Sequence, residues 1–211
     1  MATKTKTKTK KKRLTKIQMR VAIAKDVIAQ INSKKLIPET GVWIYDPKLG
    51  SIDDHIDNLI DKAMEDEEND TCRFEPFNAR DFTKKVNKCK VCALGSIFVS
   101  AVNLYNGVEF TDGENAARAF DTLEFSPLSN YFSPRELAFI ETCFEGEDSA
   151  HWTDVDGKDS AIAIAYNRSF PKAKDRLISI MKNIIRNKGA FIAEQDLTKE
   201  MLIENLANMI M

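Results

Sequence analysis

The chain has 211 residues, of which 43% are hydrophobic and 30% are charged, so a globular domain with a heavily solvated surface is expected and a wholly disordered chain is excluded. The net charge of −1 hides two opposite parts: residues 1–35 hold twelve lysines and arginines and one aspartate, whereas the remaining 176 residues carry 19 basic and 31 acidic side chains. No segment has the roughly 18 apolar residues of a membrane helix, and no apolar signal segment follows the N-terminal lysines, so we expect a cytoplasmic protein that does not enter a membrane.

Lysine and threonine alternate at the start of the chain, where residues 2–12 read ATKTKTKTKKK. This composition predicts a disordered tail over residues 1–12 and a single helical domain over residues 13–211. A flexible arm of lysines binds any polyanion by releasing its counterions, but without aromatic side chains it reads no sequence. The candidate nucleic-acid contacts are Lys4, Lys6, Lys8, Lys10, Lys11, Lys12 and Arg13. A merely solubilising tail is the alternative.

The first element expected after the tail is a helix over residues 14–31. Its apolar residues recur at spacings of three and four and form one stripe, which we expect to pack on the body rather than on a second copy; they are Leu14, Ile17, Val21, Ala24, Ile28 and Ile31. Residues 42–45 (VWIY), bounded by Asp46-Pro47 and Gly50, predict a short strand and turn. At most one small hairpin is therefore expected, near residues 42–50.

Two further helices are predicted before the middle of the chain. Ser51 and Asp54 resemble a capping box ahead of apolar residues at helical spacing, and an acidic run over residues 53–70 follows on a face that must be solvated. Asn78 and Asp81 are expected to start a short helix that carries Phe82 and Val86.

Residues 91–105 are apolar on nearly every side, interrupted only by Gly95, Ser96 and Ser100. This pattern predicts a central helix that other helices cover, with Gly95 allowing a neighbouring helix to approach closely. A strand over residues 96–102 is the competing interpretation, because Ile97, Val99 and Val102 are β-branched.

Residues typical of helix ends recur through the rest of the chain, beyond residue 105. Capping boxes are expected at Thr111 with Glu114 and at Ser133 with Glu136. Helices are predicted from about residue 159 to 166, from Pro171 to a stop at Gly189, and from about residue 196 to the end. The fold class is therefore mainly α: a compact multi-helix domain around residues 91–105.

Four cysteines are candidate metal ligands, with His55 and His151 as the only histidines; the cysteines are Cys72, Cys89, Cys92 and Cys143. Cys89 and Cys92 have the Cys-x-x-Cys spacing of a zinc site or a redox pair, but no second close pair completes a zinc site, and the charged stretch before them does not read as the strand that a redox motif follows. We therefore expect buried, reduced, structural thiols, and no metal or cofactor.

Cys92 is also a candidate nucleophile, since a helix N-terminus lowers a thiol pKa, and His151 is the candidate base. The alternative places His151 in an exposed loop. Residues 154–159 (DVDGKD) superficially resemble a calcium loop but lack its ligands at later positions, so a plain turn is expected. Familiar phosphate-loop, dinucleotide, zinc-protease and serine-hydrolase motifs are missing from the sequence, and whether the protein is an enzyme stays open, with a non-enzymatic role favoured.

Two segments resemble known proteins: residues 90–96 (KVCALGS), and residues 175–185 (DRLISIMKNII) continuing to Gly189 and Phe191. They resemble an uncharacterised family of small bacteriophage and bacterial proteins that share a Cys-Ala-Leu-Gly core helix and have no assigned function. The resemblance implies a phage or bacterial setting, with the host-cell cytoplasm as the location if the chain is phage-encoded, and it implies no functional residue.

Three functions follow as hypotheses. The first is a non-enzymatic, phage-type accessory protein that binds a host or phage macromolecule, most simply a protein partner, through an exposed surface. The second is a nucleic-acid-associated protein that uses the basic tail without sequence preference. The third is a cysteine hydrolase that uses Cys92 and His151.

Overall fold

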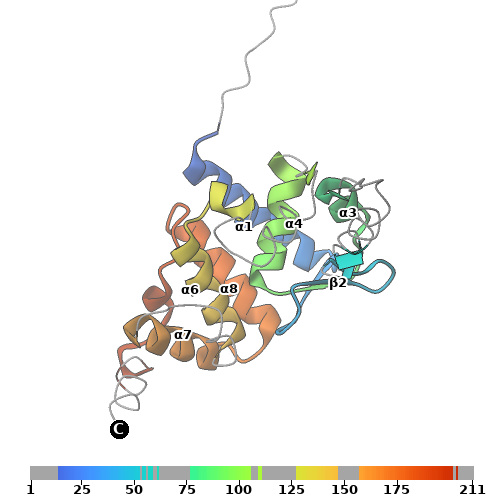
Figure 1. Cartoon of the computed structure of the whole chain (residues 1–211). Helices are drawn as coiled ribbons and strands as arrows, with labels where there is room; N and C mark the ends of the chain where they lie inside the picture. Colours follow the sequence, from blue (N-terminus) through green and yellow to red (C-terminus); the bar gives the residue numbers. More distant parts are fainter. Residues whose placement is uncertain are drawn as a thin grey trace, which may run out of the picture.

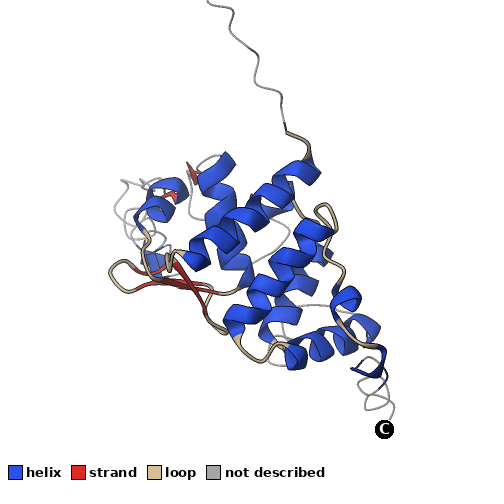
Figure 2. Cartoon of the chain, turned by 180° about the vertical axis from the view of Figure 1, so that it is seen from behind, coloured by secondary structure: helices blue, strands red, loops and turns tan. Residues whose placement is uncertain are grey.

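A computed structural model of the chain describes residues 14–52, 54–55, 57–58, 61, 77–105, 109–110, 127–146, 157–201 and 203. Helices make up most of this part (Figure 1), and a small group of strands lies at one side of them (Figure 2). The predicted mainly α-helical class is confirmed. Among the described helices, none is both long and apolar enough to cross a bilayer. The predicted tail over residues 1–12 lies outside the described residues.

Helix α1 spans Lys16–Asn32 and confirms the first predicted helix. Thr15 caps it: the Thr15 Oγ1 accepts a hydrogen bond from the Gln18 backbone nitrogen at 3.2 Å, and the Gln18 Oε1 accepts one from the Thr15 nitrogen at 2.9 Å. The C-terminal half of the apolar stripe turns inward, whereas Leu14 and Ile17 at its start are exposed.

Helix α4 spans Ala93–Tyr105 and forms the centre of the core. Every residue from Ala93 to Val102 is buried, so the predicted central helix is confirmed and the competing strand interpretation is wrong. Its two serines do not leave polar groups unpaired: the Ser96 hydroxyl donates to the Ala93 oxygen at 2.7 Å, and the Ser100 hydroxyl accepts from the Gln30 side chain at 2.9 Å.

Three more helices complete the helical body: α6 (Pro134–Glu145), α7 (Gly157–Ser169) and α8 (Ala173–Arg186). Helix α6 starts at the predicted capping box of Ser133 and Glu136. Helix α7 begins two residues before the predicted start at Asp159. Helix α8 ends as predicted before Gly189, whose φ of 98° closes the last turn through a bond from its nitrogen to the Ile184 oxygen. Helix α7 packs on α6, and α8 packs on α1.

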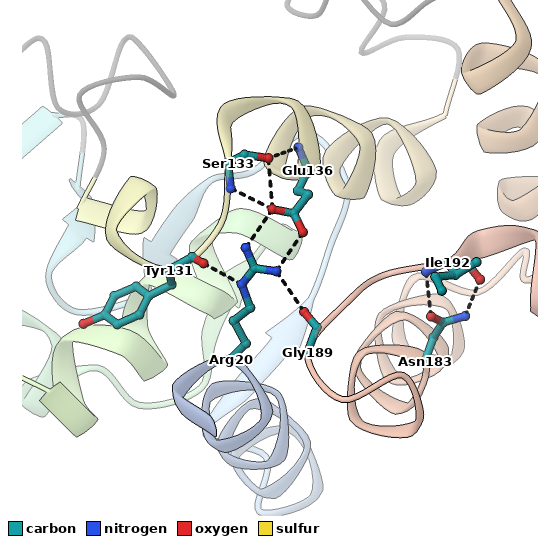
Figure 3. Close-up of polar contacts among 7 residues, drawn as sticks. All are labelled: Arg20, Tyr131, Ser133, Glu136, Asn183, Gly189 and Ile192. Carbon is teal, nitrogen blue, oxygen red and sulfur yellow. Dashed lines mark hydrogen bonds and ion pairs between the residues drawn. The ribbon is translucent and has the colours of Figure 1, made fainter. Parts of the chain in front are cut away.

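Arg20 ties α1 to α6 and to the end of α8 (Figure 3). Its two terminal nitrogens donate to the two carboxylate oxygens of Glu136, each at 2.8 Å, and its Nε donates to the Tyr131 oxygen at 2.5 Å. A longer bond of 3.3 Å reaches the Gly189 oxygen. Because Glu136 also accepts from the Ser133 nitrogen at 2.8 Å, one carboxylate caps a helix and anchors the guanidinium.

Asn183 holds the chain that follows α8 (Figure 3). Its Nδ2 donates to the Ile192 oxygen at 2.8 Å, and its Oδ1 accepts from the Ile192 nitrogen at 2.9 Å. The same Nδ2 donates to Asp196 at 2.7 Å, in the short helix η3 (Ala193–Asp196). The buried Asn183 amide thus satisfies both backbone polar groups of Ile192, as a neighbouring strand would.

The described strands form more sheet than expected. Strands β1 (Leu36–Pro38), β2 (Ile44–Asp46), β3 (Gly50–Ser51) and β5 (Cys89–Val91) form one sheet in the order β1-β5-β2-β3. The β2–β3 hairpin is the predicted one, but the prediction of at most one small hairpin is wrong. Strands β1 and β5 pair in parallel, so they need partners far away in the sequence, which no local pattern reveals.

Gly95 allows a close approach, but its neighbour is not a helix. A Cβ atom there would collide with the Trp43 backbone and with Ile44, so the predicted helix contact is corrected to a strand contact. The Cys92 nitrogen donates to the Trp43 oxygen at 3.2 Å in the same place. The start of α4 therefore lies directly against β2.

Smaller elements surround this core. Helix α3 (Ala79–Lys85) confirms the predicted short helix and buries Phe82, with Val86 just after it. Strands β4 (Phe77–Asn78) and β6 (Glu109–Phe110) form a two-stranded antiparallel sheet, and helix η1 (Pro127–Asn130) precedes α6. The described residues between 52 and 61 are helical, as are those after 198. The predicted cap at residues 111–114 lies outside the described residues.

Candidate functional site

The four-stranded sheet has one covered face and one open face among the described residues. Alternate residues of each strand point to opposite faces, and the inward set, which includes Leu36, Ile44 and Val91, is buried in the core. The outward residues Ile37 and Tyr45 are 40% and 41% exposed. Lys90 and Ser51 lie on the same face and are half-buried. Each of the four strands thus presents one side chain on this open face.

These outward side chains form a row, because the strands are in register. Lys90 pairs with Ile37 on one side and with Tyr45 on the other, and Tyr45 pairs with Ser51. The Lys90 ammonium also lies 2.9 Å from the Glu39 carboxylate. Across the sheet the row therefore reads aliphatic, basic, aromatic and hydroxyl.

A shallow hollow of about 350 Å³ opens beside this row. It is lined by Gly41, Val42, Trp43, Tyr45, Ser51 and Lys90. The Trp43 ring packs against Phe98 of α4 at a centroid distance of 5.7 Å, which holds one wall of the hollow in place. The hollow is continuous with the open face, because Tyr45, Ser51 and Lys90 belong to both.

One end of the sheet gathers lysines from three segments. In the parallel pair β1–β5 both strands start at this end, and the Cys89 nitrogen donates to the Lys35 oxygen at 3.0 Å. Strand β2 runs the other way, so its turn returns to the same end. With neighbouring strands about 4.8 Å apart, the four lysines of this basic end sit on adjacent chain segments; they are Lys34, Lys35, Lys48 and Lys88.

Asp46 links two of the segments that form the basic end. Its buried carboxylate accepts from the backbone nitrogens of Lys48 at 2.8 Å, Leu49 at 3.1 Å and Asn87 at 2.7 Å. These bonds fasten the β2–β3 turn to the segment that leads into β5. The backbone of Lys48 is thereby linked through Asp46 to Asn87, the residue before Lys88.

Two lysines of the basic end adopt the left-handed backbone conformation. Lys34 has a φ of 59° and Lys88 a φ of 58°, a region that non-glycine residues enter only at a cost. Lys34 follows the last turn of α1, where its nitrogen donates to the Ile31 oxygen at 3.0 Å and glycine is the usual residue. In the described part of the chain, none of the four lysines forms an ion pair.

The opposite end of the sheet is acidic. The Gly41 nitrogen donates to the Glu145 carboxylate of α6 at 2.7 Å. Burial, and then the charge of Glu145, raise the pKa of Glu141 to about 7, and burial also raises the pKa of Glu145. With Glu39 at the end of β1, the sheet therefore has a basic end and an acidic end.

The thiols of Cys89, Cys92 and Cys143 are buried. Burial raises the pKa of Cys89 to about 12 and raises the pKa values of Cys92 and Cys143 well above the ordinary value. The helix N-terminus does act on Cys92, whose sulfur accepts from the Gly95 nitrogen at 3.3 Å, but burial outweighs it. Burial thus disfavours the thiolate form that a nucleophile or a redox pair requires at neutral pH.

Strand β5 corrects the interpretation of the cysteine pair. The sequence predicts no strand over the charged residues 84–90, yet Cys89–Val91 is strand β5 and α4 begins at Ala93. The Cys-x-x-Cys therefore does connect a strand to a helix. Pairing with β1 explains the strand, because backbone hydrogen bonds to a distant partner outweigh the weak strand preference of Lys90.

The described residues contain no cluster of three or more histidine, cysteine or carboxylate side chains able to hold a metal ion. His55 is exposed near the Phe82 ring. Cys72, His151 and residues 154–156 lie outside the described residues. The predicted turn is corrected at its end, because Gly157 starts α7 and Asp159 pairs with Arg135 at 2.9 Å.

The tail residues Lys4, Lys6, Lys8, Lys10, Lys11, Lys12 and Arg13 also lie outside the described residues, so their role stays a prediction. The basic end and the open face were not predicted, because their residues come from segments around positions 35, 45 and 89. Comparisons of the chain with known protein families, with curated proteins and with solved structures found no match. The resemblance to phage and bacterial proteins likewise stays a prediction.

Proposed function

We propose that this protein is a non-enzymatic binding protein whose partner is nucleic acid, held without sequence preference. The observation that carries the proposal is the basic end of the sheet, where four lysines are fixed on adjacent segments without an ion pair in the described part of the chain. The seven basic side chains of residues 1–13 would add a second contact.

Electrostatics favour a polyanion over other partners at this end. Like charges on adjacent strand ends repel one another, and a chain of phosphates relieves that repulsion while releasing its own counterions. The remainder of the protein beyond residue 35 carries 31 acidic against 19 basic side chains, so most of its surface repels a polyanion. The basic end is therefore where such a partner is steered.

The tail and the basic end lie at opposite ends of one helix. The tail joins the domain just before α1, whereas Lys34 follows α1, and Figure 1 shows this helix running from the N-terminal side of the molecule toward the strands. At 1.5 Å per residue the 17 residues of α1 span about 25 Å. A single polymer lying along the protein would meet both basic elements.

The test measures the affinity for labelled oligonucleotides of two unrelated sequences between about 50 and 200 mM salt. Three proteins are compared: the full chain, a chain lacking residues 1–13, and the double variant Lys34→Gly with Lys88→Gly. Glycine suits the left-handed conformation of both positions, so the double variant loses two charges without losing stability. We expect both sequences to bind equally and the salt slope to fall by about one per lysine removed.

The matched control is Lys188→Gly. Lys188 has the same left-handed conformation, with a φ of 52°, but it follows α8 and adjoins Gly189, which contacts Ile17 and Arg20 at the far end of α1. Made in the chain that lacks residues 1–13, this variant should bind like that chain, because Lys188 lies away from the basic end. An affinity that does not change with salt concentration would contradict the proposal and indicate an interface of apolar residues. If deletion of residues 1–13 alone abolished binding, the basic end would not be part of the binding site.

A further inference from the structure

The open face of the sheet offers aromatic surface directly beside the basic end. Tyr45 is 41% exposed in the middle of the row, Ile37 is 40% exposed on its edge, and Leu49 in the β2–β3 turn is 39% exposed. Neither Tyr45 nor Ile37 belongs to the core cluster. A ring held on a strand, with Lys90 on the neighbouring strand and the lysines of the basic end where these strands begin or turn, is a platform on which a base can stack.

The hollow beside Tyr45 has room for one more planar group. Its volume of about 350 Å³ lies at the lower end of the range of small-molecule pockets. Trp43 forms one wall and is held by its contact with Phe98, so the pocket is built before a ligand arrives. The Gly41 nitrogen is already taken by Glu145, so it offers no donor to a group in the hollow.

The charges along the strands set where the phosphates of a bound polymer lie. Phosphates are drawn to the basic end at Lys35, Lys48 and Lys88, away from the end where Glu39 pairs with Lys90 and the Glu145 carboxylate accepts from Gly41. Bases would then lie over Tyr45 and toward Trp43. Three strand spacings of about 4.8 Å give a platform roughly 14 Å wide, which accommodates two or three unstacked nucleotides.

A duplex cannot use this surface in the same way. The bases of a duplex are already paired and stacked on one another, so an aromatic side chain on the face of a sheet can stack only on unpaired bases. We infer that the open face binds single-stranded nucleic acid, with one base stacked on Tyr45 and the next in the hollow beside Trp43. This inference rests on the proposed function and adds the form of the partner and its position.

The experiment compares oligo(dT), oligo(U) and a blunt DNA duplex of equal length at one salt concentration, using the full chain. The variant is Tyr45→Leu, and Tyr45→Phe is the matched control that keeps the ring. We expect Tyr45→Leu to weaken single-strand binding by about 5- to 100-fold and to leave duplex binding within about twofold, whereas Tyr45→Phe binds like the wild type. Either sugar type bound in this manner supports the inference.

A second readout follows the hollow itself. In a Trp152→Phe background Trp43 is the single tryptophan, and its fluorescence should be quenched in a saturable manner by the single strand but not by the duplex. If neither polymer binds, the proposed function fails. If single strand and duplex bind equally, and Tyr45→Leu affects neither, the proposed function stands and the stacking platform is wrong.

Discussion

Gly95 and Trp43 are in direct backbone contact where α4 begins. A Cβ atom on Gly95 would lie 2.9 Å from the Ile44 Cγ1 and closer still to the Trp43 oxygen. Backbone cannot move aside as a flexible side chain can, so this contact fixes the distance between α4 and the sheet.

The variant Gly95→Ala tests this contact. Alanine favours a helix over glycine by about 1 kcal/mol, but overpacking against backbone costs about 1 to 3 kcal/mol or more. We therefore expect a net loss of at least about 1 kcal/mol in the free energy of unfolding, measured by urea denaturation. Lys182→Ala, on an exposed site of α8, should change stability by less than about 0.5 kcal/mol. A Gly95→Ala protein more stable than the wild type would contradict the contact.

The ion pair of Arg20 and Glu136 predicts a loss of stability in acid. Burial alone acts to raise the pKa of Glu136, but hydrogen bonds from Ser133 and from Arg20 lower it overall. A carboxyl group with a lowered pKa stabilises the fold above its unfolded pKa of about 4.3, and this contribution is lost as the pH falls below that value. Glu136→Gln should lower the free energy of unfolding by about 1 kcal/mol at pH 7, a small amount because the side chain is one-third exposed. The loss should shrink progressively below pH 4, where the wild-type carboxylate is protonated. Thermal unfolding across this pH range is the measurement, and an equal cost at pH 3 and pH 7 would argue against the pair.

Glu141 predicts the opposite pH dependence. Its pKa is raised to about 7, so between about pH 4.3 and 7 the folded protein keeps a proton that the unfolded chain has released. The free energy of unfolding therefore falls as the pH rises through this window. Glu141→Gln should remove this decline and gain about 1 to 3 kcal/mol over the wild type at pH 8. Glu194→Gln, at an exposed site, is the matched control for the exchange of a carboxylate for an amide.

Burial of the thiols predicts that they do not react in the folded protein. In a Cys72→Ser variant, a thiol reagent at pH 8 should label none of Cys89, Cys92 and Cys143 before denaturant is added and all three afterwards. Mass spectrometry of the labelled protein gives the count. Rapid labelling of Cys92 in the native state would restore the hydrolase hypothesis.

Local signals explain which elements could be predicted from the sequence. The capping box of Ser133 and Glu136 places the start of α6 to the residue, and the unbroken apolar run places α4 at the centre, because both patterns act over neighbouring residues. The box of Thr15 and Gln18 at the start of α1 has the same pattern with glutamine in place of glutamate.

Strands β1 and β5 could not be predicted in the same way. Three residues are too few to show alternation, and Cys89–Val91 follows a lysine-rich stretch that argues against a strand. The candidate site was missed for the same reason, because Lys35 reaches Cys89 only through the parallel pair β1–β5, and Tyr45 reaches Lys90 only through the antiparallel pair β2–β5.

The parallel pairing of β1 with β5 also governs when the sheet can assemble. Leu36 meets Cys89 only after the whole intervening chain has been closed into a loop, which is paid for in entropy before any ladder bond forms. Helices built from neighbouring residues form sooner, so the four-stranded sheet is completed late in folding, after the helical body that it packs against.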